Sequence, residues 1–450
     1  MNAESKDLDE PEEFRTYGQE SPSVKKPQDM NWLYVLAIGL GFFTTGVSWS
    51  VYNSYLPADF LPTFIVGDLQ NTLIGLVMVL DNIFALFMQP YIGARSDSTR
   101  TRWGRRMPYI MIGTPLAAVF FTLIAYGWAV GLFWLMFAFI TIFNVSMAFY
   151  RAPVVALMPD LVPEEQRSKA NGVINLMGGI GAIYAFAVAS QIYKVSDPGL
   201  ASLFGVTVSE IGPILAFLTT SIIMVVAVLV LFYVIKEPEV PFAPDQERVG
   251  ITNAINQVSI SEDKSAIAIL AAIVFWFFGY NAIETWFTRY GNLILGFATP
   301  DASFLLNGIA LAFVIFAVPA GFIAERFGRK NTILAGLLIM MAALVLLWFT
   351  TSYLGILGIL AVAGVGWAMV NVNSIVMVWK MLGQERVGAG TGLYYLASMS
   401  AAIFGPFISG VIFDLTSIAY LYPVSIAFLI VAFVLTSLVR TGEVGDQAIS

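Results

Sequence analysis

The chain has 450 residues, of which 58% are hydrophobic and 12% are charged, and its formal net charge is −7. A soluble domain usually carries about 25% charged residues, so this composition excludes a water-soluble globular protein of this size. Cys and His are both absent, which excludes disulfides and thiolate or imidazole metal sites. Any proton coupling must therefore use carboxylates, and we expect no metal and no cofactor other than the coupling proton.

The first 30 residues are polar, acidic and interrupted by prolines. They lack the basic start, the apolar stretch and the small-residue cleavage site of a signal peptide. We therefore predict that residues 1–30 form a disordered cytoplasmic tail that carries no chemistry.

Twelve apolar stretches follow, each close to the roughly 20 residues that a membrane helix needs. The first six lie near 31–55, 69–92, 107–127, 130–157, 168–193 and 212–235. The second six lie near 264–290, 302–324, 331–350, 353–378, 387–413 and 418–439. The sequence thus predicts an all-α membrane protein with twelve transmembrane helices in two pseudo-symmetric six-helix bundles.

The boundaries of these bundles follow from the polar stretches between and after them. We predict an N-terminal bundle over 31–235, a Pro-rich charged cytoplasmic linker over 236–263, a C-terminal bundle over 264–440 and a cytoplasmic tail over 441–450. Twenty of the 23 Lys and Arg residues then fall on the side of the termini. Because basic residues concentrate on the cytoplasmic side, we expect both termini to be cytoplasmic and the protein to lie in the plasma (inner) membrane.

A short signature recurs after the second and the eighth span. In each copy a Gly stands four positions before an acid, and a Gly followed by two basic residues comes next. Such internal repeats are typical of transporters that bind substrate between their halves. We predict that both copies are loops that gate the cytoplasmic side, formed by Gly93, Asp97, Gly104, Arg105 and Arg106 and by Gly321, Glu325, Arg326, Gly328 and Arg329.

The repeated signature resembles that of the major facilitator superfamily. The segments 88–108 and 151–171 further resemble the sucrose/proton symporter branch, with its bacterial relatives, of the glycoside–pentoside–hexuronide:cation symporter group. The resemblance implies bundles that rock about a central site and expose it alternately to the two sides. It also implies transport of a sugar. The sequence has no phosphate-binding Gly-x-x-x-x-Gly-Lys-Ser/Thr motif, which disfavours ATP-driven pumping, and we expect the protein not to be an enzyme.

The chain departs from the sodium-using melibiose permeases of that group. Positions that carry aspartates in their second helix align with Ala85 and Gln89, and their sugar-binding aspartate aligns with Arg151. Their fifth-helix arginine aligns with Asn175. The resemblance therefore favours protons over sodium as the coupling ion.

Asp81 lies near the middle of the second span. A charge there costs roughly 2.5–3.5 kcal/mol on insertion scales, so it needs a partner or a wet cavity. Asp81 is either a proton-binding carboxylate or a structural acid held by a neighbouring helix. Asn82 and Gln89, the latter two turns further along, are candidate substrate contacts on the same span.

Arg151 lies inside the fourth span beside Pro153. Its guanidinium has five donors in a fixed geometry that suit sugar hydroxyls. It is a candidate for coupling or substrate binding. The alternatives are a permanent partner for Asp81 and a side chain that extends to the cytoplasmic surface.

Glu284 lies in the seventh span, with Tyr280 and Asn281 at helical spacing from it. A carboxylate, an amide and an aromatic ring on one face suit the hydroxyls and the apolar face of a sugar. Glu284 is thus a candidate for both proton coupling and substrate binding. The alternative is an interfacial residue paired with Arg289.

Further candidates are polar or aromatic residues inside other spans. A single Asn in a membrane helix is often a helix–helix contact, and a Trp is as often part of the core as part of a ligand site. These candidates are Asn53, Tyr55, Asn175, Trp367, Asn371 and Asn373.

The sequence as a whole favours proton-coupled symport of a sugar, a disaccharide or another glycoside such as sucrose or maltose. We expect a small-molecule sugar and the bilayer as partners, no nucleic acid, and function as a monomer. One alternative keeps the fold but carries a non-sugar solute or exports an amphipathic compound, which predicts a large apolar cavity. A remote alternative is a non-transporting sensor.

Overall fold

The computed structural model describes residues 31–163, 166–237, 264–382 and 387–440. The predicted tails and residues 238–263 of the predicted linker lie outside this range. Twelve helical segments of the described chain are long and apolar enough to cross a membrane. Each predicted span overlaps one of them, so the prediction of an all-helical membrane protein is confirmed.

The helices of the N-terminal half come first in the chain. They are α1 (Trp32–Tyr55), α2 (Gln70–Met78), α3 (Leu80–Ser98), α4 (Met107–Ala129), α5 (Phe133–Leu161), α6 (Arg167–Tyr184), α7 (Ser190–Ile192), α8 (Pro198–Phe204) and α9 (Val208–Val234).

The described residues of the C-terminal half form seven α-helices. They are α11 (Ser265–Leu293), α12 (Thr299–Leu305), α13 (Asn307–Phe327), α14 (Arg329–Trp348), α15 (Tyr353–Leu382), α16 (Val387–Leu415) and α17 (Leu421–Ser437).

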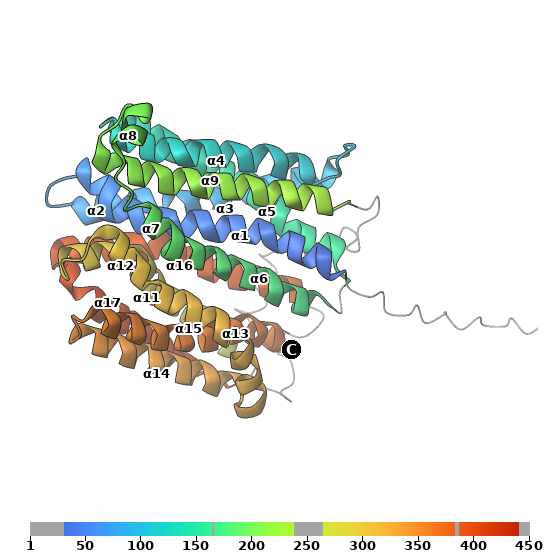
Figure 1. Ribbon diagram of the computed structural model, residues 1–450. Coiled ribbons are helices and arrows are strands. Elements are labelled where there is room, and N and C mark those ends of the chain that lie inside the picture. Colours follow the sequence, from blue (N-terminus) through green and yellow to red (C-terminus); the bar gives the residue numbers. More distant parts are fainter. Residues whose placement is uncertain (1–30, 164–165, 238–263, 383–386, 441–450) are drawn as a thin grey trace, which may run out of the picture.

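The two halves lie side by side with their long helices running in the same general direction (Figure 1). The described chain begins and ends at one end of the bundles, which we call the proximal face. At the other end, the distal face, α1 ends and α2, α8 and α12 lie (Figure 1). Many large hydrophobic side chains point outward, including Trp134, Val226 and Phe322, as expected for helices surrounded by lipid.

The first two spans differ from their predicted form. The first continues beyond residue 55 through a π turn, Leu56–Phe60, and a 3-10 turn, Leu61–Thr63. Each turn has a proline within its first two residues, and each proline removes one backbone N–H donor from the continuing helical segment. The second span is broken at Val79, which separates α2 from α3 and leaves Asp81 in the first turn of α3.

The predicted gating loops are mostly helical, which corrects the prediction. Gly93 and Asp97 lie in the last turns of α3, while Gly321, Glu325 and Arg326 lie in the last turns of α13. Arg329 is the first residue of α14. The hydropathy of a span ends with the hydrocarbon, whereas the helix continues for one or two polar turns beyond it.

Within the N-terminal half, glycines bring α1 and α6 into close contact. A Cβ at Gly46 would lie 2.1 Å from the carbonyl oxygen of Gly178. A Cβ at Gly181 would lie 2.6 Å from the carbonyl oxygen of Phe43. Small residues at such crossings allow backbones to pack directly, so α1 and α6 are held at a fixed separation.

Replacing Gly46 with alanine should destabilise the protein by about 1–3 kcal/mol, the usual range for overpacking. The new methyl group forces α1 away from the backbone of α6. Thermal unfolding of the purified protein measures the effect. Gly358→Ala is the matched control, because a Cβ there meets nothing within 4 Å; an equal loss in both variants would contradict the packing argument.

Candidate functional site

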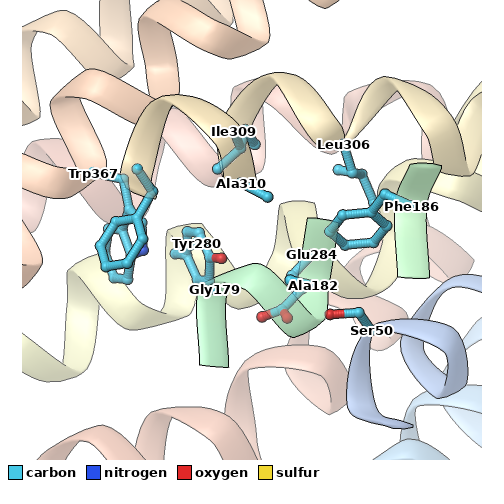
Figure 2. Close-up of a pocket in the computed structure, with 11 residues that line it drawn as sticks. Ser50, Gly179, Ala182, Phe186, Tyr280, Glu284, Leu306, Ile309, Ala310 and Trp367 are labelled. Carbon is cyan, nitrogen blue, oxygen red and sulfur yellow. The ribbon is translucent and has the colours of Figure 1, made fainter. Parts of the chain in front are cut away.

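A cavity of about 140 Å³ lies between the two halves. The N-terminal half contributes Ser50 from α1 and three residues from α6 and the π turn after it (Figure 2). The C-terminal half contributes residues of α11, α13 and α15 and the residue before α13. The eleven lining residues are Ser50, Gly179, Ala182, Phe186, Tyr280, Glu284, Leu306, Ile309, Ala310, Phe313 and Trp367. A site built from both halves changes shape whenever the halves move.

The C-terminal half supplies the aromatic and charged groups of this cavity. The rings of Tyr280 and Trp367 stack with their centroids 3.9 Å apart and an interplanar angle of 6°. Glu284 lies one helical turn after Tyr280, and the side chain of Asn53 on α1 interacts with its carboxylate. Three sequence candidates, Tyr280, Glu284 and Trp367, thus meet at one site, and Trp367 packs against Tyr280.

Asp81 and Arg151 lie near this cavity but do not line it. The Asp81 carboxylate interacts electrostatically with both Arg151 and Glu284. It also accepts a 2.8 Å hydrogen bond from Nδ2 of its neighbour Asn82. Within the described residues no direct ion pair joins Asp81 to Arg151, so the structure contains a loosely coupled set of charges rather than a locked pair.

Other sequence candidates make local contacts or lie buried elsewhere. Asn175 is exposed and donates to the carbonyl and the side chain of Asn171. The carbonyl of Asn371 accepts from the hydroxyl of Ser374. The side-chain nitrogens of Gln89 and Asn281 are buried without a partner among the described residues. None of these four amide side chains lines the cavity.

The sequence missed the apolar part of the cavity. Ile309, Ala310 and Phe313 come from α13, and Phe186 comes from the π turn after α6. Apolar residues on membrane helices resemble their lipid-facing neighbours, so the sequence holds no signal that separates these positions. Polar Ser50, which is 4% exposed, is the lining residue that a search for polar groups within spans would have found.

At the distal face, α16 reaches across to the N-terminal half. Oδ1 of Asp414 accepts hydrogen bonds from the backbone N–H of Asn71 at 3.0 Å and from its side chain at 2.8 Å, and Oδ2 accepts from the N–H of Thr72 at 2.7 Å. These N–H groups belong to the first turn of α2, where a negative charge is favoured. Gly410 lets the backbones approach, because a Cβ there would lie 2.4 Å from the carbonyl oxygen of Asn71.

Two further contacts join the halves at this face. Arg289 of α11 is 4% exposed and donates to Oε1 of Gln70 at 2.6 Å and to Oδ1 of Asn71 at 3.2 Å. It does not pair with Glu284, which was one alternative from the sequence. Lys194 lies 2.5 Å from Asp301. The distal side of the central cavity is therefore closed by polar contacts between the halves.

At the proximal face, Arg106 is the centre of a buried cluster within the N-terminal half. Its guanidinium pairs with Asp97 and, at 2.9 Å, with Asp160, and Arg105 lies 2.8 Å from Asp160. Burial alone would lower the pKa of Arg106, but the carboxylates of Asp160 and Asp97 outweigh burial and raise it. Arg106 thus stays charged and ties the ends of α3 and α5 to the start of α4.

Glu237, from the predicted linker, completes this cluster. Its carboxylate accepts from the backbone N–H groups of Arg105 at 2.7 Å, Arg106 at 2.9 Å and Met107 at 2.8 Å. Gly104 adopts φ +110°, a backbone conformation that favours glycine. A Cβ at this position would also lie 2.5 Å from Cδ of Glu237. Glu237, the third residue after α9, therefore caps the N-terminus of α4.

The second copy of the repeat is built more simply. Glu325 and Arg326 are exposed, and Gly328, with φ +89°, forms the junction between α13 and α14. Lys330 donates to the carbonyl oxygens of Ser437 at 2.8 Å and Val439 at 2.7 Å. The two copies thus stabilise their own halves by different contacts.

Comparison with known proteins identifies the family to which this chain belongs. Residues 37–439 match the family model of MFS/sugar transport proteins. The isoprimeverose transporter of Lactiplantibacillus pentosus is 24% identical over 70% of this chain, and the chain spans 64% of the length of that transporter. The class B tetracycline resistance protein of Escherichia coli is 24% identical over 79% of this chain and 83% of its own.

Solved structures share the fold. A crystal structure of a bacterial homologue of the human lysosomal transporter Spinster, inward-facing and occupied, superposes with a TM-score of 0.67 at 16% identity, covering 91% of this chain and 95% of its own. The nucleoside transporter NupG gives a TM-score of 0.65 at 16% identity, covering 90% of this chain and all of its own. Together with the family match, these findings show that the chain is a multi-pass membrane protein of the MFS/sugar transport family.

Proposed function

We propose that the protein is a secondary active transporter that couples uptake of a sugar, a disaccharide or another glycoside, to the entry of protons. The observation that carries the proposal is the cavity between the halves, into which Glu284 and Tyr280 project. A carboxylate accepts hydrogen bonds from hydroxyl groups, and the stacked rings of Tyr280 and Trp367 offer an apolar surface to the C–H face of a sugar. The isoprimeverose transporter, similar over much of the chain, supports a glycoside as substrate.

The proposed mechanism is alternating access. The contacts of Asp414 and Arg289 hold the distal face closed, so the halves must separate there for substrate to enter from that side. The cavity of about 140 Å³ is small beside the roughly 300–1,000 Å³ of typical ligand sites, so a disaccharide also requires its walls to move apart. Proton and sugar together favour a closed state that neither stabilises alone.

Asp81, Arg151 and Glu284 supply the coupling in this proposal. Their carboxylates and guanidinium interact across the interface between the halves. Protonation of Asp81 removes its attraction for Arg151, and protonation of Glu284 removes its repulsion of Asp81. Either event changes the relative energies of the outward-open and inward-open arrangements. Protons, rather than sodium, serve as the coupling ion.

We further propose that the distal face is extracellular, because the basic residues concentrate at the proximal face. Both termini are then cytoplasmic, and the protein functions as a monomer in the plasma membrane. One hydrophobic core contains residues of both halves, and residues of the same chain line the cavity from both sides.

Counterflow in proteoliposomes tests the proposal. Purified protein is reconstituted into liposomes, which are loaded with one unlabelled sugar of a broad panel. The same sugar in labelled form is then added outside. We expect at least one glycoside to exchange and to move protons with it when a concentration gradient is applied. Absence of exchange for the whole panel, with no substrate-dependent proton movement, refutes sugar symport.

A second candidate function is export of an amphipathic compound. The observation that favours it is the lining, in which most residues are apolar. The similarity to a tetracycline resistance protein points the same way. The small volume of the cavity argues against it, and so does the family match. Export predicts that the protein protects cells against amphipathic toxins, whereas sugar symport predicts growth on a sugar.

A further inference from the structure

The cavity contains a negative group and lacks a positive one. Glu284 is the charged residue among the eleven described residues that line it, and neither Lys nor Arg is among them. Arg151, which interacts with Asp81, is not among the lining residues. Arg289 is engaged at the distal face by Gln70 and Asn71. A bound molecule therefore meets no cation of the lining.

The polar and apolar groups of the cavity occupy different sides. Figure 2 shows the Glu284 carboxylate and the Ser50 hydroxyl on one side and Ile309 and Ala310 on the opposite side. The Tyr280–Trp367 stack and Phe186 stand at opposite ends (Figure 2). This arrangement fits a ring with hydroxyls along one edge and an apolar face.

An anionic group would be poorly accommodated here. A carboxylate or phosphate loses its water on entering and finds no compensating cation, which makes burial of the charge unfavourable. When Glu284 is ionised, the two negative charges also repel each other at close range. When Glu284 is protonated, it offers one hydrogen bond, which replaces only part of the lost hydration.

We propose that this cavity selects uncharged glycosides and rejects anionic ones, uronides and sugar phosphates included, and that Glu284 is the residue that sets this selection. The inference rests on the proposed sugar transport and narrows its substrate class. A single carboxylate in an otherwise uncharged lining supplies the basis for this selection.

Matched pairs of methyl glycosides test this inference. Methyl glucoside and methyl galactoside are compared with their uronic acid counterparts, by thermal stabilisation of the purified protein and by counterflow in proteoliposomes. We expect the uronide of each pair to bind at least about tenfold more weakly, equivalent to roughly 1.4 kcal/mol. Methyl xyloside, which lacks the variable carbon, should behave like the uncharged members.

Glu284→Gln should narrow the difference within each pair by improving the binding of the uronide. Ser50→Lys adds a cation to the lining and should improve the binding of the uronide further. It is the alternative test variant if Glu284→Gln does not fold. Asp68→Asn is the matched control, because Asp68 is an exposed acid outside the cavity; it should leave the ratio unchanged.

The outcomes separate this inference from the proposed function. Equal binding of a glycoside and its uronide by the wild-type protein, or an unchanged ratio in Glu284→Gln and Ser50→Lys, overturns the selection and leaves sugar transport standing. Failure of every sugar to bind or exchange overturns the proposed function, and this inference with it.

Discussion

Asp81→Asn is expected to abolish proton-driven accumulation of the substrate while leaving exchange across the membrane intact. The amide keeps the size of the side chain but can neither bind nor release a proton. Asp81 interacts with Arg151 and with Glu284, so a permanently neutral residue uncouples these charges from the proton gradient. Accumulation against a pH gradient and counterflow without a gradient, measured on the same proteoliposomes, give the two quantities.

We expect accumulation to fall to the level set by equilibration, which is a complete loss of the driving force, while exchange stays within about threefold of the wild type because binding depends on other groups. Asp68→Asn is again the control, since it removes an exposed acid from a loop. Unchanged accumulation in Asp81→Asn would show that Asp81 is a structural acid.

Asp414→Asn should open the distal face. The carboxylate of Asp414 binds three donors at the first turn of α2 in the other half, and an amide keeps one acceptor oxygen and loses the charge. An interaction of a charge with a helix terminus is worth about 0.3–2 kcal/mol. The ratio of distal-open to distal-closed molecules should therefore rise by up to about thirtyfold.

Because the chain contains no Cys, opening of the distal face can be measured by labelling a single introduced thiol. Ser303, on α12, is fully buried where α12 packs against the N-terminal half. In a Ser303→Cys background, a thiol reagent that cannot cross the membrane should label from the distal side faster when Asp414→Asn is added.

Asp197→Asn is the matched control for this experiment. Asp197 also accepts from a helix N-terminus at the distal face, the N–H of Leu200 at 2.8 Å, but both residues belong to the same half. Its replacement should not change the labelling rate. Equal rates in the Asp414→Asn and the parent protein would mean that this contact does not hold the face closed.

The fold was predictable because its signals are local. Each span needs only length and hydropathy, and all twelve were located. Within α11, helical spacing predicted that Tyr280 and Asn281 share a face with Glu284. Tyr280 and Glu284 line the cavity together, whereas Asn281 does not line it. The stacking of Tyr280 on Trp367 brings together residues of different helices, and no spacing rule reaches across that distance in the chain.

Contacts between helices account for what the sequence did not reveal. Asp414 lies near the end of the eleventh span like any interfacial acid, and its role depends on the start of α2 being adjacent. Glu237 stood in a stretch that composition marks as a linker, yet its carboxylate caps α4. Neither Gly nor Pro stands at the break at Val79, so the local sequence does not predict it. Tertiary contacts, rather than the conformational preferences of these residues, must produce it.

That break divides the second span into two segments that contact different halves of the protein. Its outer segment, α2, is fastened to α16 by Asp414, whereas its inner segment, α3, is fastened to α4 and α5 through Arg106. Val79 is thus a joint between a piece that follows one half and a piece that follows the other. Asp81 lies two residues past this joint. A movement that separates the halves at the distal face would therefore act on the second span directly beside the acid that we propose for proton coupling.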